Sequence, residues 1–199
     1  MARRRLVIAS GNAGKLAEFE QMLAPLDFEV LPQADFGVET PPETGLTFVE
    51  NALIKARAAA EAADGPALGD DSGLVVDALA GRPGIHSSRF AGEDATDDNN
   101  IDKLLAELHD LPEERRGAYF FCCLVLLQHA EDPAPLIATG RWHGRILEAR
   151  RGDGGFGYDP VFHDARMGAT AAELPAGEKN RVSHRGRALD QLIRLIDQA

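Results

Sequence analysis

The stretch Ala118-Tyr-Phe-Phe-Cys-Cys-Leu-Val-Leu-Leu-Gln-His129 is apolar at nearly every position, and it constrains the fold more than any other part of the chain. A strand covered on both faces is apolar throughout, whereas a half-exposed strand alternates with polar residues. We therefore expect residues 118–129 to form a central strand and residues 135–148 to form its antiparallel partner. Cys122 and Cys123 would point to opposite faces of that strand, which favours core packing over a disulfide.

Strand-like and helix-like patterns are mixed on either side of this segment. Strands are predicted at 6–9 and 28–31, and helices at 15–23, 46–63, 95–108 and 179–197. The 46–63 helix has a predicted cap at Thr47, a predicted apolar face of Leu46, Val49, Leu53 and Ala56, and polar residues at Glu50, Asn51 and Lys55. No linker or repeat interrupts the pattern, so we expect one mixed α/β domain over residues 1–199.

The composition excludes several classes of protein. The chain has 21 basic and 32 acidic residues and a formal net charge of −11. Such a charge is unsuited to binding nucleic acid, because that binding depends on neutralising phosphates. The longest apolar run is about half a membrane span, and the basic residues 3–5 precede too short an apolar run for a signal peptide. We expect a cytoplasmic protein with no membrane partner.

The pair Asp70-Asp71, followed by Ser72 and Gly73, interrupts the apolar segment 67–77. Burying carboxylates among apolar residues is unfavourable unless a cation or hydrogen-bond donors compensate them. The pair therefore suggests a site for a hard divalent cation such as Mg²⁺. The alternative interpretation is a polar turn between two strands, since Asp, Ser and Gly all favour turns.

A second motif, Ser10-Gly-Asn-Ala-Gly-Lys15, lies between a predicted strand and a predicted helix. Backbone N–H groups at a helix start can bind phosphate, and Lys15 adds a positive charge. The motif is not a Walker A loop, because Ala9 and Leu16 stand where that loop needs Gly and Ser or Thr. We expect a phosphate-binding turn of another kind.

Two further motifs could contact a ligand. Gly152-Asp-Gly-Gly-Phe-Gly-Tyr-Asp-Pro160 fits a loop that approaches a flat ligand, although a hairpin loop with core aromatics is the simpler interpretation. Ser183-His184-Arg185-Gly186, with Lys179 upstream, could bind a base or a phosphate, although three cations at a helix start usually form a solvated face.

Taken together and in this order, the motifs closely resemble the inosine triphosphate pyrophosphatase family, from Leu6 to the C-terminal helix. The matching segments also include Glu43-Thr-Gly-Leu-Thr-Phe-Val-Glu-Asn-Ala52 and Gly81-Arg-Pro-Gly-Ile-His-Ser-Ser-Arg89. The resemblance implies an elongated mixed sheet flanked by helices, with two lobes and a nucleotide cleft between them. It also implies a homodimer that uses Mg²⁺ to convert ITP, dITP and XTP into the monophosphate and pyrophosphate.

The resemblance assigns roles to residues of this chain. Asp71 would be the catalytic carboxylate and a metal ligand. The family often has a metal-binding Glu three residues before the glycine that corresponds to Gly45; Pro42 stands there, so the neighbouring Glu43 becomes the candidate second ligand. The implied substrate-binding residues are Ser10, Gly11, Asn12, Ala13, Gly14, Lys15, Lys55, Ser72, Phe156, Gly157, Tyr158, Asp159, Lys179, His184 and Arg185.

Two other functions remain open from the sequence. A nucleotide-binding sensor without turnover would keep the glycine loops and the basic residues, but it would not need Asp70 and Asp71. A kinase is disfavoured because the Walker A pattern fails. Release of pyrophosphate from ITP in the presence of Mg²⁺ would separate an enzyme from a sensor.

Overall fold

The computed structural model describes residues 4–26 and 28–198. The chain divides into two compact units. Unit 1 comprises residues 1–71, 122–140 and 185–199, and unit 2 comprises residues 72–121 and 141–184. Each unit therefore combines segments that are far apart in the sequence.

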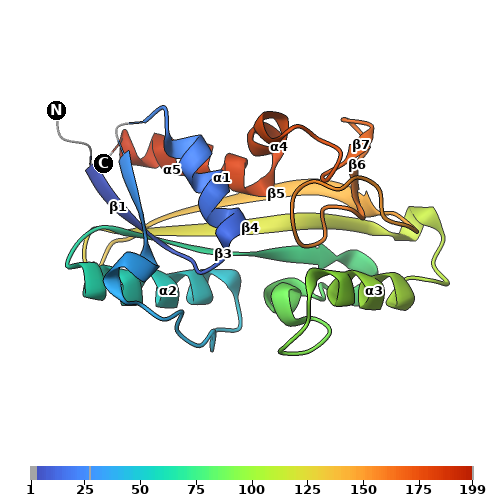
Figure 1. Cartoon of the computed structure of the whole chain (residues 1–199), viewed down its shortest axis with the longest axis horizontal. Coiled ribbons are helices and arrows are strands. Elements are labelled where there is room, and N and C mark those ends of the chain that lie inside the picture. The colour runs from blue at the N-terminus through green and yellow to red at the C-terminus, as the bar shows by residue number, and fades with distance from the viewer. Residues whose placement is uncertain (1–3, 27, 199) are drawn as a thin grey trace. The chain divides into compact units, whose positions relative to one another are not determined.

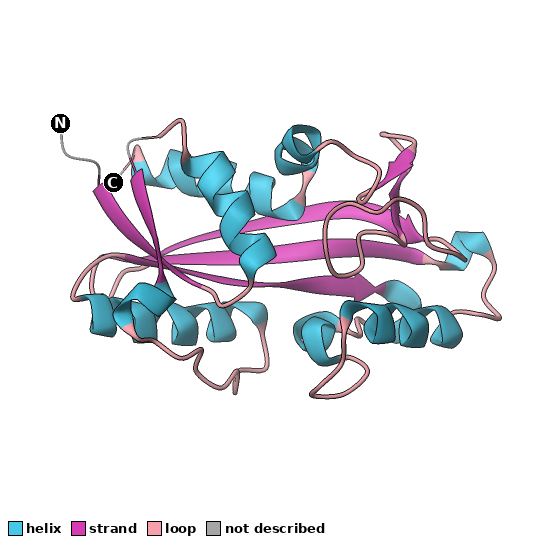
Figure 2. Ribbon diagram, viewed as in Figure 1, coloured by secondary structure: helices cyan, strands magenta, loops and turns pink. Residues whose placement is uncertain are grey.

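The strands form a seven-stranded mixed sheet in the order β2-β1-β3-β4-β5-β6-β7 (Figure 2). β1 pairs in parallel with β2 and β3, whereas β6 pairs antiparallel with β5 and β7. The apolar stretch that was predicted to be central is β4, the middle strand in this order. The strands span β1 Arg4–Ala9, β2 Phe28–Pro32, β3 Ala67–Val76, β4 Gly117–Leu127, β5 Leu136–Ile146, β6 Phe162–Asp164 and β7 Ala169–Thr170.

In unit 1, helices α1 (Ala13–Leu23) and α5 (His184–Ile196) lie on one side of the strands, and α2 (Phe48–Ala63) lies on the other (Figure 1). The core of this unit joins apolar side chains of α1, α5, β1, β3 and β4. α2 packs closely on β3 because Gly69 has no side chain: a Cβ there would lie 2.1 Å from the carbonyl oxygen of Ala52.

Unit 2 contains the helices α3 (Asp97–Glu107) and α4 (Ala176–Val182), together with the parts of the strands that do not belong to unit 1. The core includes Trp142, whose indole Nε1 donates to Asp164 Oδ2 at 2.7 Å, so this buried polar atom is satisfied. Both cysteines of β4 are buried and free, as predicted. The short 3₁₀ helices of the chain span Gln33–Phe36, Asp77–Leu79, Gly84–Arg89 and Glu113–Arg115.

Three local predictions were wrong or incomplete. The predicted apolar face of α2 is buried only in part: Ala56 is buried, but Leu46 is 86% exposed and Val49 is 37% exposed, and the buried face also includes the polar residues Asn51 and Lys55. The reason is that the surface beneath α2 carries a buried carboxylate, which a polar helix face can satisfy.

The helix predicted at 179–197 is two helices, because Ser183 is extended, with φ −68° and ψ 164°, at the end of α4. Serine readily leaves helical geometry, since its hydroxyl competes for backbone hydrogen bonds. The turn interpretation of Asp70-Asp71 also fails, because both residues lie inside the continuous strand β3. Within residues 4–26 and 28–198, no helix is long and apolar enough to cross a membrane.

Candidate functional site

The two aspartates of β3 are both buried, with 1% of Asp70 and 4% of Asp71 exposed. Successive side chains of a strand point to opposite faces of the sheet, so the two carboxylates have different neighbours. Each is compensated by cations from helices of unit 1. Asp70 and Asp71 therefore belong to two separate clusters of charged side chains, one on each face of the sheet.

Asp70 is bound by two cations. Its Oδ1 pairs with Lys15 Nζ, and its Oδ2 accepts from Arg185 Nε at 3.0 Å. Arg185 is 1% exposed and also pairs with Glu18 of α1. The Cys122 thiol donates to Asp70 Oδ2 at 3.3 Å. Asp70 is therefore an anion held between α1 and α5.

Asp71 faces α2. Its Oδ1 accepts from Lys55 Nζ at 2.8 Å, and the same nitrogen donates to Glu43 Oε1 at 2.9 Å. Its Oδ2 accepts from Asn51 Nδ2 at 3.4 Å. One ammonium group thus bridges the two carboxylates that were predicted to bind metal.

These surroundings shift the two pKa values in opposite directions. Burial raises the pKa of Asp70, but Arg185 and Lys15 outweigh it and hold that pKa well below its usual value. Burial also raises the pKa of Asp71, and Lys55 and Lys15 offset it only in part, so the net shift is upward. Asp71 is consequently a stronger proton acceptor than Asp70.

The loop before α1 is ordered by its own side chains. Asn12 caps the helix by accepting from the backbone N–H of Lys15 at 2.9 Å, and the Ser10 hydroxyl accepts from the N–H of Asn12 at 3.2 Å. The loop residues Gly11, Asn12 and Ala13 are exposed, whereas Ser10 is buried. This arrangement presents a helix start with a lysine beside it, which is suited to an anion such as a phosphate.

The donor set at Asp71 fits Mg²⁺. This ion is usually bound by one or two carboxylates and keeps several waters, so Glu43 and Asp71 would suffice. Among the described residues, no group of three or more His, Cys, Asp and Glu side chains is placed to hold a metal ion. Lys55 supplies the positive charge between the two carboxylates, and their attraction outweighs its burial and raises its pKa.

A second group of predicted residues lies in unit 2, on the glycine-rich loop and α4. Lys179 Nζ donates to Asp159 Oδ2 at 2.6 Å and lies 4.8 Å from the centroid of the Phe156 ring. The same Asp159 oxygen accepts from the N–H of Phe156 at 2.9 Å. Gly155 has φ +74°, and a Cβ there would lie 2.0 Å from Asp159 Oδ2, so this position requires glycine.

The rest of this loop is anchored to other parts of unit 2. The Tyr158 hydroxyl donates to the Ser87 carbonyl at 2.8 Å, and the Gly157 N–H donates to Asp97 Oδ2 at 2.7 Å. The His184 ring stacks on Phe120 with centroids 4.8 Å apart. Lys179 and His184 are both buried, as is Arg185 in unit 1, so these three basic residues do not form a solvated face.

The predicted site residues therefore form two groups, one in each unit. In unit 1, Lys15 and Arg185 pair with Asp70, and Lys55 joins Glu43 to Asp71. Unit 2 brings Phe156, Asp159 and Lys179 into contact and holds Gly157, Tyr158 and His184 through other partners. Ser72 is half-buried in β3.

Three residues of these clusters were missed from the sequence: Glu18, Asn51 and Cys122. The spacing contained a signal for two of them. Asn51 lies four residues before Lys55 and Glu18 three residues after Lys15, so each shares a helix face with a predicted site residue. Nothing in the sequence relates Cys122 to Asp70, which is 52 residues away.

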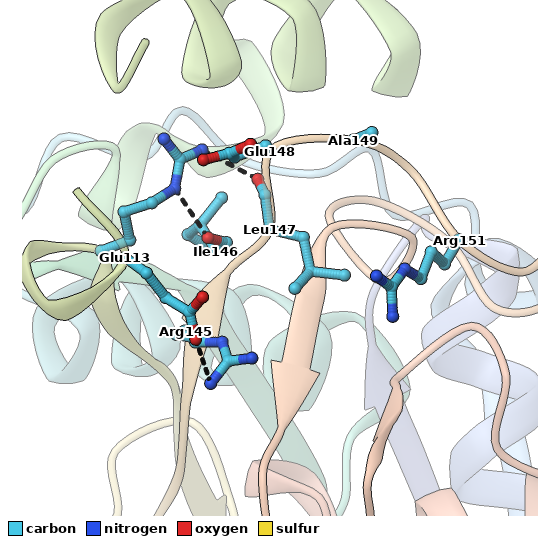
Figure 3. Close-up of a pocket in the computed structure, with 8 residues that line it drawn as sticks. Glu113, Arg145, Ile146, Leu147, Glu148, Ala149 and Arg151 are labelled. Carbon is cyan, nitrogen blue, oxygen red and sulfur yellow. Dashed lines mark hydrogen bonds and ion pairs between the residues drawn. The ribbon is translucent and has the colours of Figure 1, made fainter. Parts of the chain in front are cut away.

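Unit 2 also contains a pocket of about 310 Å³ that is lined by arginines and glutamates (Figure 3). Its buried Arg116 donates to the carbonyls of Leu108, Ile146 and Leu147 at 2.7–2.8 Å. Arg145 pairs with Glu113 at 2.8 Å. Arg116 thus closes the end of α3 and joins it to the end of β5, which is a structural role.

The fold and these clusters define a class: an α/β protein with an open mixed sheet and a buried site where carboxylates meet lysine and arginine. The chain belongs to the Ham1 family, whose sequence profile matches residues 6–195. Membership of the family that was predicted from the motifs is thereby confirmed.

Relatives named dITP/XTP pyrophosphatase match nearly the whole chain. The dITP/XTP pyrophosphatase of Halorhodospira halophila is 57% identical over 192 residues, which are 96% of each chain. That of Legionella pneumophila is 54% identical and covers 97% of this chain and 98% of its own.

Solved structures agree with these matches. A HAM1 protein from Coxiella burnetii superposes with a TM-score of 0.90 at 48% identity, covering 98% of this chain and all of the other. A nucleoside-triphosphatase, also named dITP/XTP pyrophosphatase, from Mycobacterium abscessus gives a TM-score of 0.75 at 42% identity, covering 96% of this chain and 99% of the other. The predicted mixed sheet with flanking helices is confirmed.

Proposed function

We propose that this chain hydrolyses deaminated purine nucleoside triphosphates, namely ITP, dITP and XTP, to the monophosphate and pyrophosphate. The reaction would remove these nucleotides before they are incorporated into DNA or RNA. The observation that carries the proposal is the pair Glu43 and Asp71 bridged by Lys55, in a family whose similar members are named dITP/XTP pyrophosphatases. The relatives indicate the substrate class, and the cluster provides groups suited to phosphate chemistry.

In this proposal Glu43 and Asp71 hold Mg²⁺, which would neutralise phosphate charge and polarise the attacked phosphorus. Asp71 orients the attacking water and accepts its proton. The bond between the α- and β-phosphates breaks, and water supplies the new oxygen. Lys15 stabilises the charge on the departing pyrophosphate.

The loop 10–15 and Lys55 would bind the triphosphate. In unit 2, Phe156 offers a ring on which a purine base can stack and His184 offers a donor; Arg185 of unit 1 is a second candidate donor. A donor aimed at the 6-keto oxygen of hypoxanthine or xanthine is left unpaired by the amino group of adenine, which disfavours ATP. Ser72 would contact the substrate beside Asp71.

The wider biological setting is part of the same proposal. We expect a homodimer in the cytoplasm that needs no nucleic acid or membrane partner, and we expect residues 1–199 to act as one catalytic domain. The net charge of −11 supports the absence of a nucleic-acid partner. Analytical ultracentrifugation of the purified protein tests the dimer, and a sedimentation coefficient of a 21.4 kDa monomer would contradict it.

The decisive experiment identifies the products. Purified protein incubated with ITP and Mg²⁺ is expected to release IMP and pyrophosphate in equal amounts, measured by ion-exchange chromatography. Binding of ITP without turnover would support the sensor instead. Release of IDP and inorganic phosphate would show that a different anhydride bond is cleaved.

A further inference from the structure

Asn51 is a fully buried amide on α2 that joins two segments of unit 1. Its Nδ2 donates to Asp71 Oδ2 at 3.4 Å, and its Oδ1 accepts from the backbone N–H of Gly45 at 2.8 Å. Gly45 lies two residues after Glu43. We infer that Asn51 is a positioning residue for Mg²⁺ binding, which holds Asp71 and the Glu43 loop in a fixed relation. This inference rests on the proposed function.

The orientation of the amide is determined by its partners. The N–H of Gly45 can only donate, so the Asn51 oxygen must face it. The nitrogen then faces Asp71, whose ionised carboxylate can only accept. A flipped amide would lose both hydrogen bonds, so a single arrangement is satisfied.

Asn51 acts together with Lys55, one helical turn further along α2. The two side chains approach different oxygens of Asp71, with Asn51 at Oδ2 and Lys55 at Oδ1. Each also contacts the preceding loop, Asn51 at the backbone of Gly45 and Lys55 at the side chain of Glu43. The carboxylate is therefore held at both oxygens, and the loop at two points.

The loop lies directly against the start of α2. A Cβ at Gly45 would be 2.5 Å from Glu50 Cβ and 2.7 Å from Asn51 Oδ1. The backbone here can approach the amide only because Gly45 has no side chain. The position of Glu43 is thus tied to Asn51 through a short and closely packed connection.

Asn51 and Lys55 differ in how they respond to a metal ion. A divalent cation between Glu43 and Asp71 repels the ammonium of Lys55, because like charges at short range in a partly buried site interact strongly. The neutral amide of Asn51 experiences no such repulsion. It could therefore orient Asp71 both before and after the cation binds.

The test compares Asn51 with a second buried asparagine that has the same kind of structural task. Asn100 on α3 is 2% exposed, donates to the Ser88 carbonyl at 3.0 Å and accepts from the Ala91 N–H at 2.7 Å. It holds a loop in unit 2 through two backbone groups, neither of which is a carboxylate. Asn51→Ala and Asn100→Ala each remove one buried amide, and only the first removes a partner of Asp71.

Three quantities are measured for the wild type and both variants. They are Mn²⁺ binding by electron paramagnetic resonance, the Mg²⁺ concentration that half-saturates ITP hydrolysis, and the thermal midpoint of the metal-free protein. In Asn51→Ala we expect the Mn²⁺ Kd and the Mg²⁺ half-saturation to rise about tenfold, the scale typical of a lost partner of a metal ligand. KM for ITP at saturating Mg²⁺ should change less. In Asn100→Ala only the thermal midpoint should fall.

The outcomes separate this inference from the proposed function. A wild type without Mg²⁺-dependent turnover overturns the proposed function. A wild type that has this turnover, with metal binding unchanged in Asn51→Ala, overturns the role of Asn51 alone. If Asn51→Ala does not fold, Asn51→Leu keeps the branched shape at Cγ without donor or acceptor and is judged by the same two metal measurements.

Discussion

Asp70 and Asp71 are neighbours in β3, yet their side chains have opposite environments. Asp70 is surrounded by Lys15 and Arg185, which lower its pKa, whereas the pKa of Asp71 is raised because burial dominates. Carboxylates whose environments push their pKa values apart commonly have different roles. We expect Asp70 to maintain the fold and Asp71 to participate in the reaction.

Replacing Asp71 with asparagine tests the chemical task. Asp71→Asn keeps the shape of the side chain but removes its ability to accept a proton and to bind a cation by charge. Turnover of ITP should fall by at least about a hundredfold, while the circular dichroism spectrum stays that of the wild type. Asp77→Asn, at an exposed aspartate just after β3, is the control. Near-wild-type hydrolysis by Asp71→Asn would remove this residue from the mechanism.

Replacing Asp70 tests the structural task. Asp70→Asn leaves Arg185 and Lys15 without their shared carboxylate, which should lower the free energy of unfolding at pH 7 by about 3 kcal/mol. A carboxyl whose pKa is lowered by folding stabilises the fold above its unfolded pKa, near 3.9 for Asp, and loses this effect as the pH falls through the folded value. The difference between variant and wild type should therefore persist at pH 5 and shrink below about pH 4.

Urea denaturation at pH 7, 5 and 3 measures this difference. Asp110→Asn is the control, because the Asp110 side chain is 98% exposed and should change stability by less than about 0.5 kcal/mol. Equal stability of Asp70→Asn and the wild type at pH 7 would contradict the structural role.

At the scale of secondary-structure elements, the contact between α2 and β3 determines where both aspartates lie. A Cβ at Gly69 would be 2.1 Å from the Ala52 carbonyl and 3.0 Å from Ala56 Cβ. Gly69→Ala should therefore lower the free energy of unfolding by at least about 1–3 kcal/mol, since the backbone must move apart. Gly177→Ala is the matched control: nothing lies within 4 Å of its Cβ in α4, and alanine favours a helix. Chemical denaturation measures the free energy of unfolding of both variants. A Gly69→Ala variant with the stability of the wild type would contradict the close packing of α2 on β3.

The loop that precedes α2 carries the second carboxylate. Since Lys55 bridges Glu43 and Asp71, Glu43→Gln should raise the Mg²⁺ half-saturation of ITP hydrolysis by at least about tenfold, with less effect on KM for ITP. The exposed Glu39 of the same loop provides the control Glu39→Gln. An unchanged half-saturation would mean that water takes the place of Glu43 around the ion.

The elements themselves were largely predictable from the sequence, because hydrophobic periodicity and caps are local signals. The apolar stretch of β4 and the Thr47 cap of α2 were predicted, and α3, predicted at 95–108, spans Asp97–Glu107. The burial of the polar residue Lys55 on α2 was not predicted. Its partner Asp71 lies 16 residues further along the chain, and no local pattern records that contact.

The candidate site was only partly predictable, because local signals reveal only some of its residues. The motifs provided Lys15, Asp71 and Lys179 because each lies in a short recognisable segment. Asp70 was included with Asp71 as one acidic pair, since the sequence does not reveal that two strand neighbours meet different helices. The functions of all these residues stay predictions until the variants above are measured.

At the scale of the whole molecule, the proposed function makes a measurable prediction about which nucleoside triphosphates are hydrolysed. If buried donors in unit 2 meet the 6-keto oxygen, kcat/KM for ITP or XTP should exceed that for ATP by at least about a hundredfold. Steady-state kinetics with ITP, dITP, XTP, ATP and GTP at saturating Mg²⁺ measures the ratio. Comparable values for ATP and ITP would contradict recognition of the 6-keto group, whatever the reaction products are.

The two cations that hold Asp70 are made at very different times during protein synthesis. Lys15 precedes Asp70 on the growing chain, whereas Arg185 follows it by 115 residues, in the last segment of unit 1. While the ribosome is still translating unit 2, Asp70 can pair with Lys15 but has no guanidinium partner. The buried end of β3 can therefore reach its final charge balance only after the segment that carries Arg185 has been synthesised, so we expect unit 1 to complete its folding later than the pairing of Asp70 with Lys15.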